Sequence, residues 1–283
     1  MATNDGAYSP ADPPFITTRS GEGVLAFRRA GERTVLAEAF ASSPLRFLTP
    51  RNHGRAAWVF LANFGGGLVD GDHLAIAVDA GPGSTAFLGT QASTKVYRSA
   101  RGCSQELAIR VDEGAAVALV PDPVACFAGA RYRQRIDVSL APTGSVLLVD
   151  GYTAGRAARG ERWAFDRFDA RTTIARAGKT VVVDATRLDP AQGPIAERMG
   201  RYDAMLTMTV VGERFAGVRE AMLAPLPAPS TGEAAVVTAS PVGADGAIVR
   251  VAATGFETAS RPLRRSFEAL ARFLGDDPFA RKW

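Results

Sequence analysis

Residues 60–99 have the sequence FLANFGGGLVDGDHLAIAVDAGPGSTAFLGTQASTKVYRS. Three consecutive glycines, Gly65–Gly67, stand just before a Leu-Val-Asp-Gly-Asp segment. Leu74, Ile76 and Val78 then alternate with small or charged residues, and this period of two predicts a half-buried strand. A Gly-Pro-Gly turn and a second apolar run follow. The stretch therefore predicts short strands joined by tight turns, with a charged segment at its end.

The same pattern continues along most of the chain. Short apolar or alternating runs recur roughly every 10–15 residues, with Gly or Pro between them and no helix-length pattern until late. This spacing predicts a mainly β body of meanders or stacked layers and argues against βαβ units. In one run, residues 131–140, every second residue is apolar or Gln and the other face carries three arginines, so that face must meet water or an acidic partner.

Two helices are predicted near the C-terminus. The first covers residues 213–223. In the second, Ser260 is expected to cap the N-terminus and Gly275 to end the helix. Its apolar stripe is given by Leu263, Phe267, Leu270 and Leu274. Core packing is the commoner explanation of such a stripe, and a partner-binding surface is the alternative.

Bulk properties bound the function. The chain has 283 residues and a formal net charge of only +4, so it forms one large domain or two small ones and is only mildly basic. We find no nucleic-acid-binding motif, no apolar run of about 18 residues and no signal peptide. We therefore expect a cytoplasmic protein that binds neither membrane nor nucleic acid. Residues 1–14 are polar and proline-rich, and we expect a disordered tail.

Common catalytic and metal motifs are missing. The glycine spacing from Gly66 to Gly71 fits a phosphate loop, but Asp72 would repel phosphate where the motif needs lysine. The two histidines and two cysteines show no metal-cluster spacing, and no Gly-x-Ser-x-Gly elbow occurs. The remaining chemistry is therefore based on carboxylates.

Three carboxylates stand in glycine-rich contexts. Asp70 and Asp72 are two residues apart, so they would share one face of an extended backbone. The commoner interpretation is an Asp-capped turn. Glu161 follows a glycine shortly after Arg156, and a structural Arg–Glu pair is the commoner interpretation there too.

Several blocks together resemble the family of urease accessory proteins called UreD or UreH. The blocks are GGGLVDGDHLAIAV (65–78), TQASTKVYRS (90–99), LVPDP leading to Phe127 (119–127), GRAARGERW (155–163), and IVR (248–250) with the terminal helix and Arg-Lys-Trp. They follow the family order over about residues 56–283. Asp70 replaces a glycine that is usual in the family.

The resemblance implies a single domain over residues 15–283, with a layered, β-helix-like body and two helices near the C-terminus. It also implies a maturation factor that is not an enzyme. Such proteins bind UreF, which recruits the GTPase UreG, and the assembly docks on apo-urease and delivers nickel. No tightly bound cofactor is expected, only Ni²⁺ in transit.

We therefore hypothesise a polar interior path that passes Ni²⁺ along carboxylates, which bind a divalent ion loosely enough for it to move on. The candidate ligands are Asp72, Glu161 and Asp70. The residues expected to support that wall are Arg156, Lys95, Tyr97 and Thr90, and the weaker candidate ligands are His73 and Cys126. Two rival functions are a β-rich module that binds a carbohydrate or small ligand and a metal-dependent hydrolase using the three carboxylates.

Overall fold

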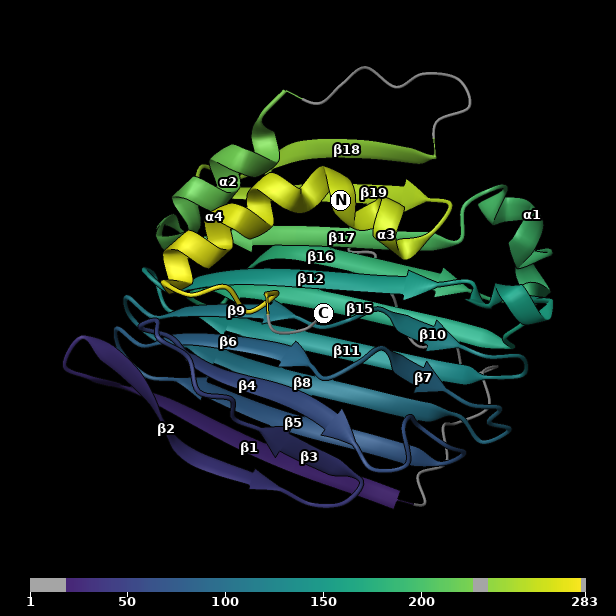
Figure 1. The fold of residues 1–283 in the computed structure, drawn as a ribbon, viewed down its shortest axis with the longest axis horizontal. Helices are drawn as coiled ribbons and strands as arrows, with labels where there is room; N and C mark the ends of the chain where they lie inside the picture. Colours follow the sequence, from purple (N-terminus) through teal and green to yellow (C-terminus); the bar gives the residue numbers. More distant parts are fainter. Residues whose placement is uncertain (1–18, 226–233, 281–283) are drawn as a thin grey trace.

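The structure is a computed structural model that describes residues 19–225 and 234–280, and most of its strands lie in two stacked sheets (Figure 1). Sheet A contains β1 Arg19–Ala30, β2 Arg33–Ala41, β5 Asp72–Ala80, β8 Cys103–Val111, β11 Arg131–Leu140, β15 Arg167–Arg176 and β16 Lys179–Leu188. Sheet B contains β3 Leu45–Leu48, β4 Ala57–Asn63, β6 Thr85–Thr90, β7 Thr94–Val96, β9 Ala116–Val120, β10 Val124–Cys126, β12 Ser145–Thr153, β17 Ala204–Val211, β18 Ala235–Val242 and β19 Gly246–Ala253. The expected mainly β fold is confirmed.

The remaining elements are short. A small ribbon pairs β13 Gly155–Arg156 with β14 Glu161–Arg162. The helices are α1 Ile195–Met199, α2 Ala216–Leu223, α3 Phe256–Ser260 and α4 Arg264–Leu274, and the 3₁₀ turns are η1 Ala157–Arg159, η2 Pro190–Gln192, η3 Glu213–Phe215 and η4 Arg261–Leu263. The tail predicted for residues 1–14 lies outside the described residues. Within the described ranges, no helix is long and apolar enough to cross a bilayer.

The chain alternates between the two sheets. From β4 to β15 it visits B, A, B, A in turn, and each visit to a sheet adds a strand parallel to the previous one there. Parallel neighbours need a crossover connection, and here the strand in the other sheet supplies it. Tight turns such as Gly81–Ser84 are therefore sufficient between strands. This circuit is the layered, β-helix-like arrangement that the family resemblance implied.

Burial explains the two kinds of strand pattern in the sequence. In β11, inward residues are buried and the alternate residues are partly or fully exposed, because sheet A is covered on one face only. In β9, all five residues are buried, because sheet B is covered on both faces. We call the apolar layer between the sheets the inter-sheet core, and the layer between sheet B and helices α2, α3 and α4 the helix-side core.

The C-terminal helices follow the prediction in most respects. Leu263, Leu270 and Leu274 are buried in the helix-side core, which favours the core-packing explanation of the stripe. Gly275 ends α4 in the left-handed conformation, as expected. The predicted cap is wrong: Ser260 has helical dihedral angles and its hydroxyl donates to the Glu257 carbonyl, because the helical segment already begins at Phe256.

Candidate functional site: a polar row inside the sandwich

The glycine loop is attached to the segment that ends the opening stretch. Leu68 N donates to Lys95 O at 2.8 Å, and Tyr97 N donates to Leu68 O at 2.9 Å. A Cβ on Gly67 would lie only 2.4 Å from Lys95 O, so this approach requires glycine. The loop and the Lys95–Tyr97 segment therefore form one wall at the N-terminal end of β5.

Asp72 points inward from this wall. Its side chain is 3% exposed, and Oδ2 accepts a hydrogen bond from Val69 N at 2.8 Å. Oδ1 is also buried, and no residue in the described part of the chain donates to it. A buried carboxylate oxygen with no donor is costly and points to a function or a bound species.

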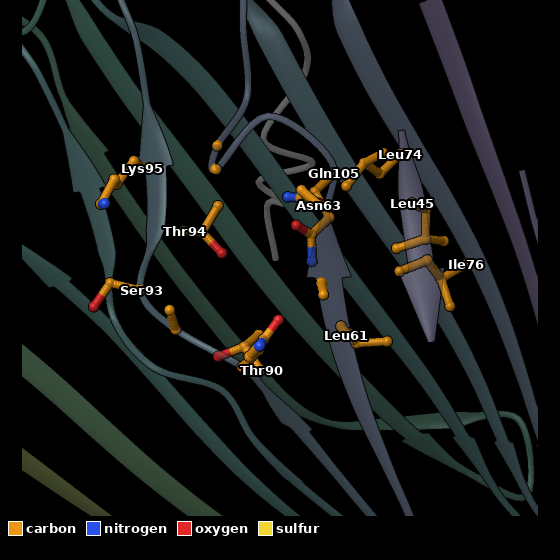
Figure 2. A pocket seen from close by; sticks show the side chains of 15 residues that line it. Leu45, Leu61, Asn63, Leu74, Ile76, Thr90, Ser93, Thr94, Lys95 and Gln105 are labelled. Atoms are coloured by element: carbon orange, nitrogen blue, oxygen red, sulfur yellow. The ribbon is translucent and has the colours of Figure 1, made fainter. Parts of the chain in front are cut away.

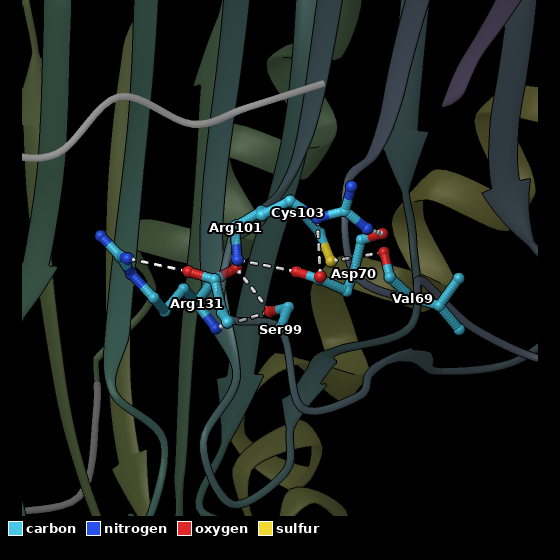
Figure 3. A network of polar contacts seen from close by, with 7 residues as sticks. Val69, Asp70, Ser99, Arg101, Cys103 and Arg131 are labelled. Atoms are coloured by element: carbon cyan, nitrogen blue, oxygen red, sulfur yellow. Dashed lines mark hydrogen bonds and ion pairs between the residues drawn. The ribbon is translucent and has the colours of Figure 1, made fainter. Parts of the chain in front are cut away.

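Asp70 does not share a face with Asp72, contrary to the extended-backbone prediction. The segment is a turn in which Gly71 has a φ of +85°, so the two side chains diverge. Asp70 lies at the surface, where Arg101 donates to it from its backbone N at 2.7 Å and from Nε at 2.8 Å (Figure 3). Although partial burial opposes it, this pairing with Arg101 lowers the pKa of Asp70.

Glu161 is held by Arg156, as the structural interpretation predicted. Arg156 Nε donates to Oε2 at 2.8 Å and Nη2 to Oε1 at 2.5 Å, a bidentate pair that lowers the pKa of Glu161. The Arg156 guanidinium also lies 4.3 Å from the ring centroid of Phe127, and Tyr97 packs edge-on against the same ring at 5.3 Å. Arg156, Tyr97 and Glu161 thus belong to one stacked cluster.

The other predicted residues are dispersed. Thr90 Oγ1 donates to Asp122 at 2.9 Å, and Lys95 is exposed. His73 is one residue out of phase with the inward positions and contacts Ser104 Oγ through Nδ1 at 2.8 Å. Cys126 is fully buried, and burial raises the pKa of its thiol, which disfavours the thiolate that a metal would need.

A cavity of about 150 Å³ opens beside the glycine loop. Figure 2 shows Thr94 and Asn63 facing one another across it, whereas Lys95 extends away. Gln105 also lines the cavity, and its register partner on the next strand is Gln134. The cavity therefore leads into the inter-sheet core through polar side chains.

From Gln134 the polar side chains continue into the sandwich. Gln134 Oε1 accepts from Tyr132 Oη at 3.2 Å, and its Nε2 donates to Asp150 Oδ1 at 3.0 Å. Burial, reinforced by the negative charge of Asp184, raises the pKa of Asp150. Asp184 in turn accepts from Arg250 Nη2 at 2.9 Å at the far edge of the sheets.

We call the residues Asp72, Gln105, Tyr132, Gln134, Asp150 and Asp184 the polar row. Register relates the first members. Leu74 of β5 pairs with Gln105 of β8, so Asp72, two residues earlier, is level with Cys103. Cys103 and Gln105 pair in turn with Tyr132 and Gln134 of β11. Burial also raises the pKa of the Cys103 thiol, to about 11, so this neighbour of the row stays protonated. In the described ranges, no three His, Cys, Asp or Glu side chains come together as a metal cluster.

Sequence reasoning missed Asp150. Its signal was its phase: it follows the apolar run Ser145–Val149 and has the same inward parity as Val146 and Leu148. A carboxylate at an inward position of a buried strand is rarely there without a partner or a purpose.

Comparison with known proteins agrees with the sequence blocks. Residues 19–283 match the family model described as UreD urease accessory protein. The chain belongs to the UreD family. A UreD urease accessory protein of Sorangium cellulosum (strain So ce56) is 51% identical over 97% of this chain and 91% of its own length. One of Anaeromyxobacter sp. (strain Fw109-5) is 41% identical over 95% and 91%, and the urease accessory protein D of Oryza sativa subsp. indica 29% over 95% and 98%. These UreD relatives are named as accessory proteins and not as enzymes.

Proposed function

We propose that this protein acts in urease maturation, as a UreD-type scaffold that works with UreF and UreG and passes Ni²⁺ toward apo-urease through the polar row. Family membership supports the role in maturation. The single observation that supports the path is the polar row itself, which lies in an inter-sheet core formed mainly by apolar side chains.

The chemistry of the row suits an ion in transit. Asp72 offers a buried oxygen without a donor, and Asp150, farther along the row, is hydrogen-bonded to a neutral amide rather than to a cation. Oxygen ligands in small number hold Ni²⁺ less tightly than a cluster of His and Cys would. Burial raises the pKa of Asp150, which disfavours its charged form and so weakens its hold on a cation.

Asp70 and Glu161 have other roles in this proposal. Each is paired with an arginine, so each stabilises the wall beside the cavity in the absence of metal. Glu161 can reach a passing ion only if Arg156 releases it. Asp72 is therefore the first ligand that we propose on the path.

The test is reconstituted urease activation with UreF, UreG and Ni²⁺. The Asp72→Asn and Asp150→Asn double variant should lower the nickel content and activity of urease by about tenfold, a loss typical of altered metal ligands. Asp137→Asn is the matched control, since Asp137 lies on the exposed face of β11. Co-purification with UreF is measured in parallel, so that lost assembly is separated from lost transfer. Full activation by the double variant would exclude the path.

The rival ligand-binding module has less support. It predicts a concave aromatic site, whereas the cavity beside the glycine loop is lined by amides, hydroxyls and aliphatic side chains.

A further inference from the structure

Three arginines gather at the end of the sandwich opposite the glycine loop, where the turns that follow β5 and β8 lie. They are Arg29 from β1, Arg55 from the loop before β4, and Arg214 from η3. Their backbone segments are far apart in sequence, so the fold brings them together. We call them the arginine corner.

Arg214 is partly buried and lies at the centre of the corner. Its Nη1 donates to Gly114 O at 2.7 Å, and its Nη2 donates to Thr85 Oγ1 at 3.2 Å. The guanidinium also lies 5.3 Å from the ring centroid of Phe273. No carboxylate of the described residues forms an ion pair with it, so its charge meets only neutral groups.

Arg55 is linked to the same point through the backbone. Its carbonyl accepts from Thr34 N at 2.8 Å, and Thr34 Oγ1 accepts from Thr85 N at 2.8 Å. Thr85 is also the residue whose hydroxyl accepts from Arg214. The Arg55 guanidinium itself makes no hydrogen bond or ion pair within residues 19–225 and 234–280, so its donors are available.

Arg29 completes the corner from the other side. A Cβ on Gly83 would lie 3.2 Å from Arg29 Cδ, and a Cβ on Gly114 would lie 3.9 Å from Gly83 Cα. Arg29 and Arg214 thus flank the same pair of glycine turns. Arg29 Nε donates to Gly31 O at 2.9 Å. Within the described ranges its one ion pair is with Glu32, at 3.6 Å, whose side chain is 84% exposed, and such a surface pair contributes little.

Two of the three arginines of the corner, Arg55 and Arg214, have no ion-pair partner among the residues that the structure describes. Burial lowers the pKa of Arg214, and the charges of Arg29 and Arg55 lower it further. The end of α4 lies beside the corner: Leu274 O accepts from Arg55 N at 3.2 Å, and Asp276 Oδ2 accepts from His53 N at 2.9 Å. A helix C-terminus carries only a partial negative charge, so it balances one of the three cations at most.

We propose that the arginine corner is a binding site for a small oxyanion of the size of phosphate. Guanidinium groups present paired N–H donors that match the oxygens of a phosphate, and one bound anion would offset the mutual repulsion of the three cations. Capping of the α4 C-terminus is the other explanation of the cluster, and it requires no anion.

The test uses inorganic phosphate and the purified full chain. At constant ionic strength set with chloride, phosphate should raise the melting temperature and give a saturable isotherm in titration calorimetry. Arg55→Gln should weaken phosphate binding by about tenfold or more, the effect expected when one charge-assisted hydrogen bond is lost. This variant should fold, since the Arg55 guanidinium has no partner in the described part of the chain.

Arg264→Gln is the matched control and should bind phosphate like the wild type, because Arg264 is exposed on α4 and already pairs with Glu268. Arg214→Gln should lose binding too, but it also breaks two structural hydrogen bonds. Equal stabilisation by chloride, or an unchanged affinity in Arg55→Gln, would overturn the proposal and leave helix capping as the role of the corner. Neither outcome bears on nickel transfer.

Discussion

The two cores of this protein share sheet B and yet differ in chemistry. On β12, Leu147 and Val149 belong to the helix-side core, whereas Leu148 and Asp150 face sheet A. The helix-side core is packed mainly from apolar side chains, with Ser266 of α4 also buried, whereas the inter-sheet core contains the polar row. The comparison teaches that the two faces of one strand can differ in chemistry: one packs apolar side chains against the helices, while the opposite face, one residue out of phase, carries a hydrogen-bonded carboxylate.

The largest effect should come from the helix-side core. Leu270 is 0% exposed, and Leu270→Ala should lower the free energy of unfolding in urea by about 2–5 kcal/mol, because it removes buried methyl groups and leaves a cavity. Leu223→Ala is the control, since Leu223 is 39% exposed and its loss should change stability by about 0.5 kcal/mol at most. Similar losses in both variants would contradict the assignment of α4 to this core.

A smaller effect is expected inside the polar row. Gln134→Leu removes the partner of both Tyr132 and Asp150, and each unsatisfied buried group costs about 1–3 kcal/mol. Gln105→Leu is the same change one strand away, at a side chain without a hydrogen bond to the described residues. It should cost less in the same urea titration. Equal costs would show that the hydrogen bonds of the row do not hold it together.

The smallest effect is a dependence on pH. Since burial raises the pKa of Asp150 in the folded state, its protonated form favours folding, and that contribution is lost as pH rises through the raised pKa. Asn cannot ionise, so the stability of Asp150→Asn relative to the wild type should improve from acidic to neutral pH. Urea unfolding across that range measures the difference. For Asp137→Asn, on the exposed face, the dependence of unfolding free energy on pH should stay parallel to that of the wild type. A parallel dependence for Asp150→Asn would contradict a raised pKa of Asp150 in the folded state.

Much of the fold could be predicted from the sequence because burial leaves a direct pattern. The alternation in 131–140 predicted a strand with one face in water, and β11 has that pattern. Short apolar runs predicted further strands, and the run 116–120 is the fully buried β9. The circuit between the sheets could not be obtained this way, because period and turn residues are the same for a hairpin and for a crossover.

The site was predictable only in part. Asp72 was found from its glycine context, and it is buried as a wall residue should be. For Asp70 and Asp72 the commoner interpretation, a turn capped by Asp, agrees with the structure, whereas the alternative of a shared extended face is wrong, because a turn and an extended strand have the same i, i+2 spacing. Asp150 was missed because its partners, Gln134 and Asp184, lie on other strands and become neighbours only through the register of the circuit.

The circuit of alternating strands also has a consequence for how the chain gains and loses structure. From β4 to β15, each turn of the circuit pairs only with the turn before it and the turn after it, as repeats do in a solenoid. Folding can therefore spread from one turn to the next in chain order, while the antiparallel β1–β2 and β15–β16 pairs end sheet A at both edges. Amide exchange would then be slowest in the middle turns of the stack and faster toward either end.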